Sequence, residues 1–246
     1  MRLRGRKGIK EALEAQPELV VLEPQANKGR WREAFGNDRP IHVELGMGKG
    51  KFISELSALN PETNYIGIDM YDELIRRGSE KARDSREVHG GDLSNLRLVR
   101  FNIEDLEDIF EQGELNRIYL NFSDPWPKKK HARRRLTHPA FIRKYEQVLN
   151  EWGEIHFKTD SRSLFEFSLN SFADLGIRLR QISLDLHADG PRTDLVMTEY
   201  ETKFSQQGMP IHRLEALIGP KALQAHIERL AGVDEAAAAE ESEQPE

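Results

Sequence analysis

The sequence predicts an α/β fold with a mostly parallel central sheet and helices on both faces. Three observations predict it. From residue 41 onward, short apolar runs alternate with longer stretches of helical character. The first of these runs leads into a glycine-rich turn, which is typical of a strand followed by a helix. The last two runs follow each other without a helix between them, so they are expected to form an antiparallel pair at one edge of the sheet.

The elements follow in chain order. Strands are expected at 41–45, 64–69, 96–101, 117–122, 153–160, 177–186 and 195–204, and helices at about 51–59, 71–88, 139–149 and 161–174. Residues 1–40 are expected to form a basic N-terminal extension with a helix near 9–15, and residues 41–213 the main domain. A short helix is expected over 214–231, and a disordered acidic tail over 232–246.

Composition restricts the classes of protein. The chain has 246 residues and no cysteine, which excludes disulfides and thiolate sites and favours a cytoplasmic protein. It lacks the apolar run that a membrane span requires. The last fourteen residues hold six acidic groups and no basic one, which accounts for the net charge of −6. Basic groups concentrate at 2–10 and 128–135, as in nucleic-acid-binding proteins, although such runs are more often only solvated surface.

The first chemical motif is "VELGMGKGKF", residues 43–52. Gly46, Gly48 and Gly50 follow a strand and open a helix, and glycines permit close approach of the backbone to a ligand. Asp69 ends the next strand, where an acid in such a fold accepts hydrogen bonds from ribose hydroxyls. The alternative is a tight turn with Asp69 as a helix cap. The combination of the glycine turn with Asp69 favours an adenosine-containing ligand.

The nature of this ligand follows from the neighbouring polar residues. Asn102 follows the third strand and could meet an adenine edge. Glu44 lies inside the first strand, where a carboxylate needs a partner such as an amino group of the ligand. The ligand could be NAD or S-adenosylmethionine; no pyrophosphate site is evident, a ligand with an ammonium and a carboxylate suits Glu44 and the helix start, and the stretch after the fourth strand decides between the two.

The segment "NFSDPWPKKKHARRRL", residues 121–136, joins a carboxylate to a basic cluster. Asp124 precedes Pro-Trp-Pro, in which the prolines fix the backbone. Residues 128–135 then hold six basic side chains and a histidine. The Asp-Pro-Trp-Pro run resembles the signature of methyltransferases that act on nitrogen, and the basic cluster is suited to an RNA backbone.

Taken together, these segments resemble the bacterial tRNA (guanine-N(7))-methyltransferases. "HVELGMGKGKF", "YIGID", "NFSDPWPKKKHARRRL", "EIHFKTD" and "MTEYETKF" are similar to that family's blocks, and the resemblance covers about residues 31–213. It implies a Rossmann-like class I methyltransferase that transfers a methyl group from S-adenosylmethionine to guanine 46 in the variable loop of tRNA.

The resemblance also implies the site residues. Asp124 is the candidate catalytic residue, and the cofactor contacts are Glu44, Gly46, Gly48, Asp69, Asn102 and Asp124. The implied tRNA contacts are Lys128, Lys130, His131, Ala132, Arg133, Arg134, Arg135, Asp160, Thr198, Glu199, Tyr200 and Glu201. His131 and His138 receive no catalytic role. Without the resemblance, Thr198 and Glu201 would read as ordinary polar positions of an edge strand and Asp160 as a helix cap.

The chemistry agrees with this assignment. N7 of guanine carries a lone pair and no proton, so methyl transfer needs alignment rather than a general base. A carboxylate can hold the N–H edge of the base and stabilise the positive charge that develops, and Asp124, Asp160 and Glu201 are the candidates. Two alternatives remain open, a non-catalytic RNA-binding protein and a methyltransferase for another nitrogen substrate. No metal is expected, and the protein is expected to be a monomer or a homodimer.

Overall fold

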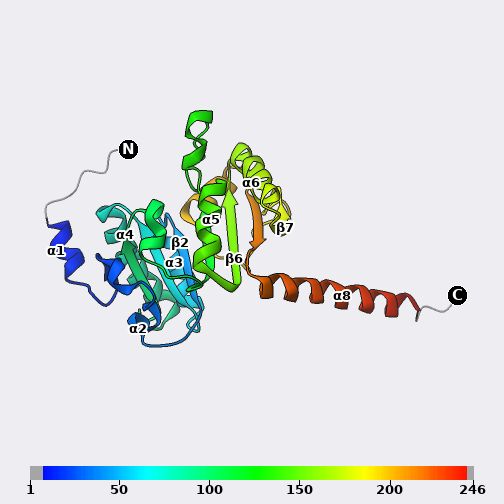
Figure 1. The fold of residues 1–246 in the computed structure, drawn as a ribbon. Coiled ribbons are helices and arrows are strands. Elements are labelled where there is room, and N and C mark those ends of the chain that lie inside the picture. The colour runs from blue at the N-terminus through cyan, green and yellow to red at the C-terminus, as the bar shows by residue number, and fades with distance from the viewer. Residues whose placement is uncertain (1–7, 243–246) are drawn as a thin grey trace.

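A computed structural model describes residues 8–242 of the chain (Figure 1). The strands are β1 (Val20–Val21), β2 (Ile41–Leu45), β3 (Asn64–Asp69), β4 (Leu96–Arg100), β5 (Leu115–Asn121), β6 (Leu149–Thr159), β7 (Arg178–Ser183) and β8 (His212–Leu217). The helices are α1 (Ile9–Glu14), α2 (Trp31–Phe35), α3 (Lys51–Leu59), α4 (Asp72–His89), α5 (Pro139–Val148), α6 (Arg162–Asp174), α7 (Glu199–Gln206) and α8 (Pro220–Ser242). Short 3₁₀ helices lie at Pro24–Asn27, Ile103–Asp108 and Lys129–Arg134.

The eight strands form one sheet in the order β1-β4-β3-β2-β5-β6-β8-β7. Neighbours from β1 to β6 are parallel, and β8 is antiparallel to both β6 and β7. The predicted fold class is therefore confirmed. After β2 the chain proceeds outward to β3 and β4, then returns to place β5 on the other side of β2. The order reverses between β2 and β5, and ligands of open α/β sheets bind beyond the carboxyl ends of strands at such a point.

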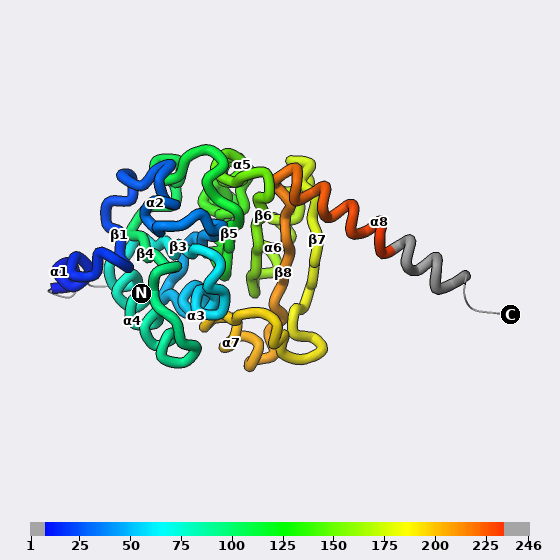
Figure 2. The backbone as a smooth tube through the Cα atoms, turned by 90° about the horizontal axis from the view of Figure 1, so that it is seen from below, coloured from blue at the N-terminus to red at the C-terminus, as the bar shows by residue number. Residues whose placement is uncertain are grey.

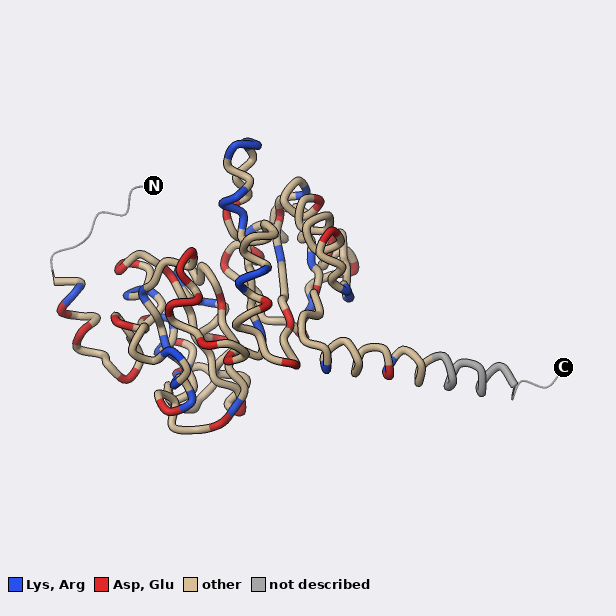
Figure 3. Tube along the Cα trace, in the orientation of Figure 1, with Lys and Arg blue, Asp and Glu red and all other residues tan. Residues whose placement is uncertain are grey.

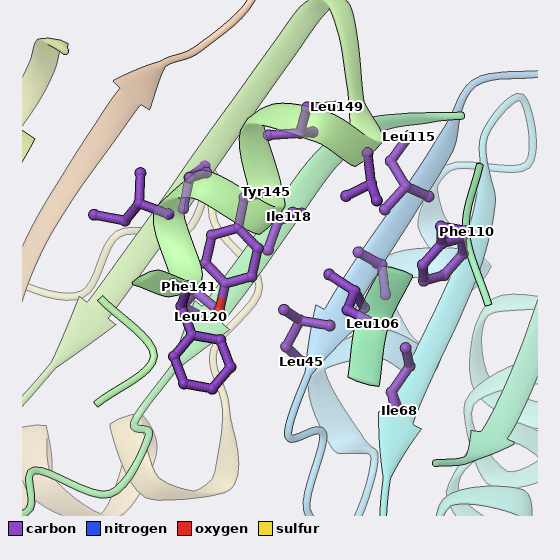
Figure 4. Close-up of a cluster of buried hydrophobic side chains, with 14 of the residues drawn as sticks. Leu45, Ile68, Leu106, Phe110, Leu115, Ile118, Leu120, Phe141, Tyr145 and Leu149 are labelled. Carbon is purple, nitrogen blue, oxygen red and sulfur yellow. The ribbon is translucent and has the colours of Figure 1, made fainter. Parts of the chain in front are cut away.

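Helices cover the two faces unequally. One face carries the largest cluster of buried apolar side chains, against which α2, α5 and α6 pack (Figure 4); it includes Leu45, Ile68, Leu106, Phe110, Leu115, Ile118, Leu120, Phe141, Tyr145 and Leu149. On the other face, α3 and α4 cover β3 and β4 through a smaller cluster around Ile53 and Leu98, and α1 packs against α4. On that second face, the half of the sheet from β5 to β7 carries mainly polar and charged side chains.

The antiparallel edge pair is made of different strands from those expected. Residues 178–183 form β7 as predicted, but its partner is β8, whereas 195–204 contains a loop and the first part of α7. The strand prediction for 195–204 is wrong because Thr198 caps a helix there: its side chain accepts a hydrogen bond from Glu201 N, and the Glu201 side chain accepts one from Thr198 N. The helix expected over 214–231 starts later, at Pro220, because residues up to Leu217 belong to β8.

The two ends of the chain differ in how they join the body. Trp31 of α2 is fully buried and donates from Nε1 to the Ile109 carbonyl at 2.8 Å, and β1 pairs with β4, so residues 9–40 are built into the packed structure. Helix α8 extends away from the sheet (Figure 2). It runs to Ser242, into the alanine-rich segment for which a disordered tail was expected. Most of the basic stretch at residues 2–10, and residues 243–246, lie outside the described part. No helix within residues 8–242 combines the length and apolar character needed to cross a membrane.

Candidate active site

The glycine-rich turn after β2 forms the floor of the site. Gly46, Gly48 and Gly50 have φ angles of 78°, 56° and 76°, a left-handed backbone region that favours glycine. The N–H groups of Gly46 and Met47 both donate to the Ile68 carbonyl at 3.0 Å, which folds the turn over the end of β3. Helix α3 begins at Lys51, directly after the turn. The turn thereby leaves room above the carboxyl ends of β2 and β3.

Two adjoining cavities lie at this edge. The first cavity, about 490 Å³, is lined by residues that include Asp69, Asn102, Asp124, Trp126, Arg134 and Tyr200. The second cavity, about 460 Å³, is lined by residues that include Glu44, Lys49, Lys51, Asn121, Glu199 and Tyr200. Both cavities are lined by Gly46, Gly48, Leu74, Phe122 and Tyr200. The glycine turn thus separates two compartments of one site.

Glu44 is a buried carboxyl group at the second cavity. It is 2 % exposed, and its Oε1 accepts a hydrogen bond from Asn121 Nδ2 at 2.9 Å. Its Oε2 is buried and has no hydrogen-bond partner among the described residues. Burial raises the pKa of Glu44 to about 8, although the hydrogen bond from Asn121 and the charge of Lys158 oppose this shift. A cationic donor from a ligand would satisfy Oε2.

Asp69 and Asn102 line the first cavity on the β3–β4 side. Asp69 accepts hydrogen bonds from Gly48 N and Tyr71 N, both at 3.2 Å, and burial raises the pKa of its carboxyl group. It therefore joins the glycine turn to the start of α4, although Tyr71 occupies the cap position itself. Asn102 caps the following 3₁₀ helix by accepting from Glu104 N at 3.2 Å. Both side chains are held in place by the backbone around them.

Asp124 is exposed at the first cavity, on a constrained segment after β5. Phe122 and Trp126, two residues to either side, have φ angles of 51° and 40°. Positive φ in non-glycine residues costs about 1–3 kcal/mol and concentrates at functional sites. Phe122 N still donates to the Lys158 carbonyl at 2.9 Å, which ties the segment to β6. The backbone is therefore strained on both sides of Asp124, in the conformation that places this residue at the first cavity.

The basic cluster projects from the body as an arm, residues 125–136 (Figures 1 and 3). Lys128, Lys130 and Arg133 are exposed there. Lys129 and Arg134 are exposed as well, and Arg135 is half-buried, but Arg134 and Arg135 also make contacts within the arm. The Arg134 guanidinium lies 4.8 Å from the centre of the Trp126 ring. Arg135 donates to the carbonyls of Pro125 and Trp126 at 3.1 and 3.0 Å.

These contacts divide the six basic side chains of the arm by role. Arg134 and Arg135 contact Trp126 and its neighbours and fix the conformation of the arm, whereas the exposed Lys128, Lys129, Lys130 and Arg133 can meet a polyanion. His131 and Ala132 lie in the 3₁₀ helix of the arm, and the His131 ring centre is 5.8 Å from that of Trp126.

The start of α7 contributes to the same site. Tyr200 is 57 % exposed, lines both cavities and stacks on Phe122 with ring centres 6.4 Å apart. Glu199 forms an ion pair with Lys49 of the glycine turn at 2.7 Å. Thr198 is mostly buried but also lines the second cavity, whereas Glu201 faces inward. Glu201 is 0 % exposed and pairs with Lys158 and His187, so its carboxylate is directed away from a substrate base.

Asp160 does not line either cavity of the glycine turn. It lines a separate hollow with residues that include Phe165, Leu184, Pro210 and His212. It is not the cap of α6 either, because Ser161 Oγ accepts from Leu164 N at 3.3 Å and the helix begins at Arg162. Of the three carboxylates that were candidates to hold the base, Asp124 lines the first cavity, whereas Asp160 and Glu201 line neither cavity.

Several site residues were missed by the sequence analysis. Asn121 contacts Glu44, and Lys49, Lys51 and Lys158 contact the segment that leads into α7. A signal for Lys158 was present, because a lysine between apolar and polar positions of a central strand needs an acidic partner just as Glu44 needs a cationic one. The lysines of the glycine turn gave no such signal, since their partners lie about 150 residues away in the sequence.

Within residues 8–242, one cluster of two glutamates and a histidine has the geometry of a metal site. Oxygen and nitrogen atoms of Glu154, His156 and Glu215 lie within 4.8 Å of one another. Arginines occupy the same carboxylates: Arg117 and Arg180 contact Glu154 at 3.0 and 2.7 Å, and Arg180 and Arg213 contact Glu215. Ion pairs therefore account for this cluster without a metal.

Comparisons with known proteins agree with this geometry. A model of the family described as "Putative methyltransferase" matches residues 38–214. A curated relative named tRNA (guanine-N(7)-)-methyltransferase, from Streptococcus sanguinis (strain SK36), is 52 % identical over 216 residues, which are 88 % of this chain and 99 % of the relative. Another of the same name, from Geobacillus sp. (strain WCH70), is 50 % identical over 90 % of this chain and 97 % of its own length.

Solved structures share the fold at low identity. The 16S rRNA methyltransferase KamB matches with a TM-score of 0.58 and 14 % identity over 78 % of this chain and 94 % of its own. The 16S rRNA (adenine(1408)-N(1))-methyltransferase from Catenulisporales acidiphilia matches with a TM-score of 0.55 and 17 % identity over 82 % and 95 %. The chain has the class I methyltransferase fold and belongs to the tRNA (guanine-N(7)-)-methyltransferase family.

Proposed function

We propose that this protein transfers a methyl group from S-adenosylmethionine to N7 of a guanine in tRNA, at position 46 of the variable loop. The observation that carries the proposal is the meeting of two sets of groups at one edge of the sheet. Glu44 and Asp69 offer acceptors at the two cavities, and Asp124 stands at the same place with the basic arm behind it. The names of the curated relatives support the same substrate.

The residues present fit the proposed cofactor. Glu44 Oε2, buried and unpartnered, would accept from its ammonium group. Asp69 retains free lone pairs beside its two backbone contacts and would accept from the ribose hydroxyls. Asn102 would meet the adenine edge, and Gly46 and Gly48 permit close approach of the backbone. Both cavities have the volume of small-molecule sites. When bound, the cofactor supplies an electrophilic methyl group on a sulfonium.

The residues of the first cavity suit a guanine. Asp124 would accept hydrogen bonds from the N–H donors of the base edge and stabilise the positive charge that the ring gains. Trp126 and Tyr200 offer aromatic surfaces against which a base removed from its stack can lie. Because N7 carries no proton, these groups serve alignment and electrostatics, and a general base is unnecessary.

The arm would hold the RNA backbone. Phosphate contacts supply affinity and register without reading sequence, and Lys128, Lys130 and Arg133 are exposed for this purpose. The arm follows directly from the segment that carries Asp124. Backbone contacts along the arm would therefore place a neighbouring nucleotide at the cavity.

The test is methyl transfer from tritiated S-adenosylmethionine to bulk tRNA, followed by mapping of the labelled nucleotide. Label in N7-methylguanine at position 46 is the expected outcome. Binding of tRNA without transfer would favour a non-catalytic RNA-binding protein. Label on another nitrogen, or on a small amine, would favour a methyltransferase with a different substrate.

A further inference from the structure

The start of α7, which carries Glu199 and Tyr200 to the site, is fastened to the sheet by a buried set of polar contacts. Lys158 Nζ donates to Glu201 Oε2 at 2.6 Å and to the Val196 carbonyl at 3.1 Å. His187 Nε2 lies 3.0 Å from Glu201 Oε1. These three side chains are from 0 to 8 % exposed. Charged groups at such depth are stable only when each has its partners, so the arrangement strongly favours one position of the segment.

The contacts reach every part of the segment that leads into the helix. Glu201 Oε2 accepts from Thr198 N at 3.3 Å, and Thr198 Oγ1 accepts from Glu201 N at 2.9 Å. His187 comes from the loop after β7 and also accepts at Nδ1 from Arg192 N at 3.3 Å. One carboxylate therefore joins β6, the 184–198 loop and the first turn of α7.

The opposite side of the segment is attached to the glycine turn and to the first residue of α3. Lys49 Nζ contacts Glu199 at 2.7 Å, and Lys51 Nζ donates to the Met197 carbonyl at 3.3 Å. Helix α7 lies beside α3 in Figure 2, in agreement with these contacts. Tyr200 lies between the buried contacts of Glu201 and the contacts made by the two lysines, and there it lines both cavities.

We propose that Lys158, Glu201 and His187 form a buried latch that positions Tyr200 and Glu199 over the site, and that Lys158 and His187 are positioning residues for methyl transfer. The latch explains why Glu201 belongs to the site region although it lines neither cavity. Its catalytic part rests on the proposed function. Its structural part, the immobilisation of residues 196–206, does not.

The sharpest single change is His187→Phe, which keeps the size of the ring and removes the contact with Glu201. His187→Gln, which retains an N–H donor, is the conservative variant. Thr193→Ala, at an exposed position of the same loop, is the matched control. Thr198→Val serves as a second test at the other side of the carboxylate, because it removes the hydroxyl that caps α7 without changing charge.

The first measurement is amide hydrogen exchange of the protein alone. His187→Phe and Thr198→Val should accelerate exchange in residues 196–206 by about 10-fold or more and leave the strands β2–β6 unchanged. His187→Gln should lie close to the wild type, and Thr193→Ala should equal it. Wild-type exchange in both disruptive variants, or equal acceleration across the whole chain, would overturn the latch.

The second measurement separates binding from turnover. With tRNA and cofactor saturating, kcat should fall about 10-fold or more in His187→Phe, because a mobile Tyr200 no longer holds the base in line. The KM for tRNA and the cofactor Kd should stay within about 2-fold, because the arm and the glycine turn are intact. Faster exchange with unchanged kcat would show that the latch does not serve catalysis. Absence of methyl transfer in the wild type would instead reject the proposed function and leave the exchange result standing.

Discussion

Glu44 is held in its protonated form at neutral pH, because burial raises its pKa to about 8. A cofactor ammonium placed at Oε2 would lower this pKa, so cofactor binding should release close to one proton from Glu44 at pH 6.5 and fewer above pH 8. Affinity should accordingly weaken as the pH falls below about 8. Calorimetry in two buffers that differ in ionisation enthalpy measures the released protons. Glu44→Gln is the control, and an unchanged proton release in it would contradict the assignment.

Asp69 offers a second residue-level test of the cofactor site. Asp69→Ala should weaken S-adenosylmethionine binding by about 1–3 kcal/mol, because it removes the proposed ribose contacts and the acceptor for Gly48 N. Asp69→Asn keeps one acceptor oxygen and should lose less. Both affinities can be measured by titration calorimetry. Equal affinity in wild type and alanine variant would remove Asp69 from the site.

Asp124 is expected to act mainly in the transition state. Asp124→Asn keeps the shape of the side chain and removes its charge, so turnover should fall by about 100-fold or more while tRNA binding changes little. Single-turnover methyl transfer at saturating tRNA and cofactor is the measurement. Since Asp160 and Glu201 do not face the first cavity, the structure offers neither as a replacement. A near-normal rate in the asparagine variant would mean that the charge takes no part in the reaction.

At the scale of elements, the basic arm contains two kinds of cation. Replacing Lys128, Lys130 and Arg133 together by alanine should raise the KM for tRNA and reduce the slope of log affinity against log salt by about 0.7–0.9 per lost phosphate contact. Alanine at three exposed cations away from the site, Lys28, Lys221 and Arg229, is the control of equal charge. If both triple variants show the same salt slope, the arm has no special contact with RNA.

Arg135 should behave differently from the exposed cations of the arm. It donates to the carbonyls of Pro125 and Trp126, so Arg135→Ala should loosen the segment that carries Asp124. We expect kcat to fall more than tRNA affinity. Steady-state kinetics with varied tRNA distinguishes the two effects, and a pure change in KM would place Arg135 among the phosphate contacts instead.

At the scale of the whole molecule, a network of charges joins the four neighbouring strands β5, β6, β8 and β7 on the second face of the sheet. Arg117, Arg180 and Arg213 surround Glu154 and Glu215. Burial alone would raise the pKa of Glu154, but the hydrogen bond with His156 and the charges of Arg117, His156 and Arg180 hold it at about 2. Removing one partner of such a network leaves an uncompensated buried charge.

The pH dependence of stability follows from this pKa. The folded-state pKa of Glu154 lies below its unfolded value near 4.5, so its contribution is present above about pH 4.5 and is lost as the pH falls toward 2. For one group this amounts to about 3 kcal/mol of unfolding free energy. Denaturant unfolding between pH 5 and 2 should show this loss in the wild type and a smaller slope in Glu154→Gln. Parallel curves for the two proteins would contradict the role of Glu154.

Much of the fold and part of the site could be predicted from the sequence, because they depend on local patterns. Alternating apolar runs and helical stretches determine the strands β2 to β6, and parallel strands with covering helices follow from their order. Glycine spacing determines the turn at Gly46–Gly50. Glu44 and Asp69 could be recognised as candidate site residues because a carboxylate inside a strand or at its end stands out from the few residues around it. Asp124 and the arm are contiguous in the chain, so their proximity needs no tertiary information.

The tertiary structure decided the rest, since it depends on partners distant in sequence. Residues 195–204 have the β-type composition of a strand, but the capping box at Thr198 and the ion pair of Glu201 with Lys158 make them a loop and a helix. Asp160 and Glu201 show the same dependence: Asp160 follows the end of β6 and Glu201 lies in the first turn of α7, and neither lines the two cavities of the glycine turn. The sequence also could not show which cations of the arm contact Trp126 and its neighbours. In a run of like charges all positions look alike. Sequence alone determines which groups are available at the carboxyl edge of the sheet, and burial and pairing determine which of them face the cavity.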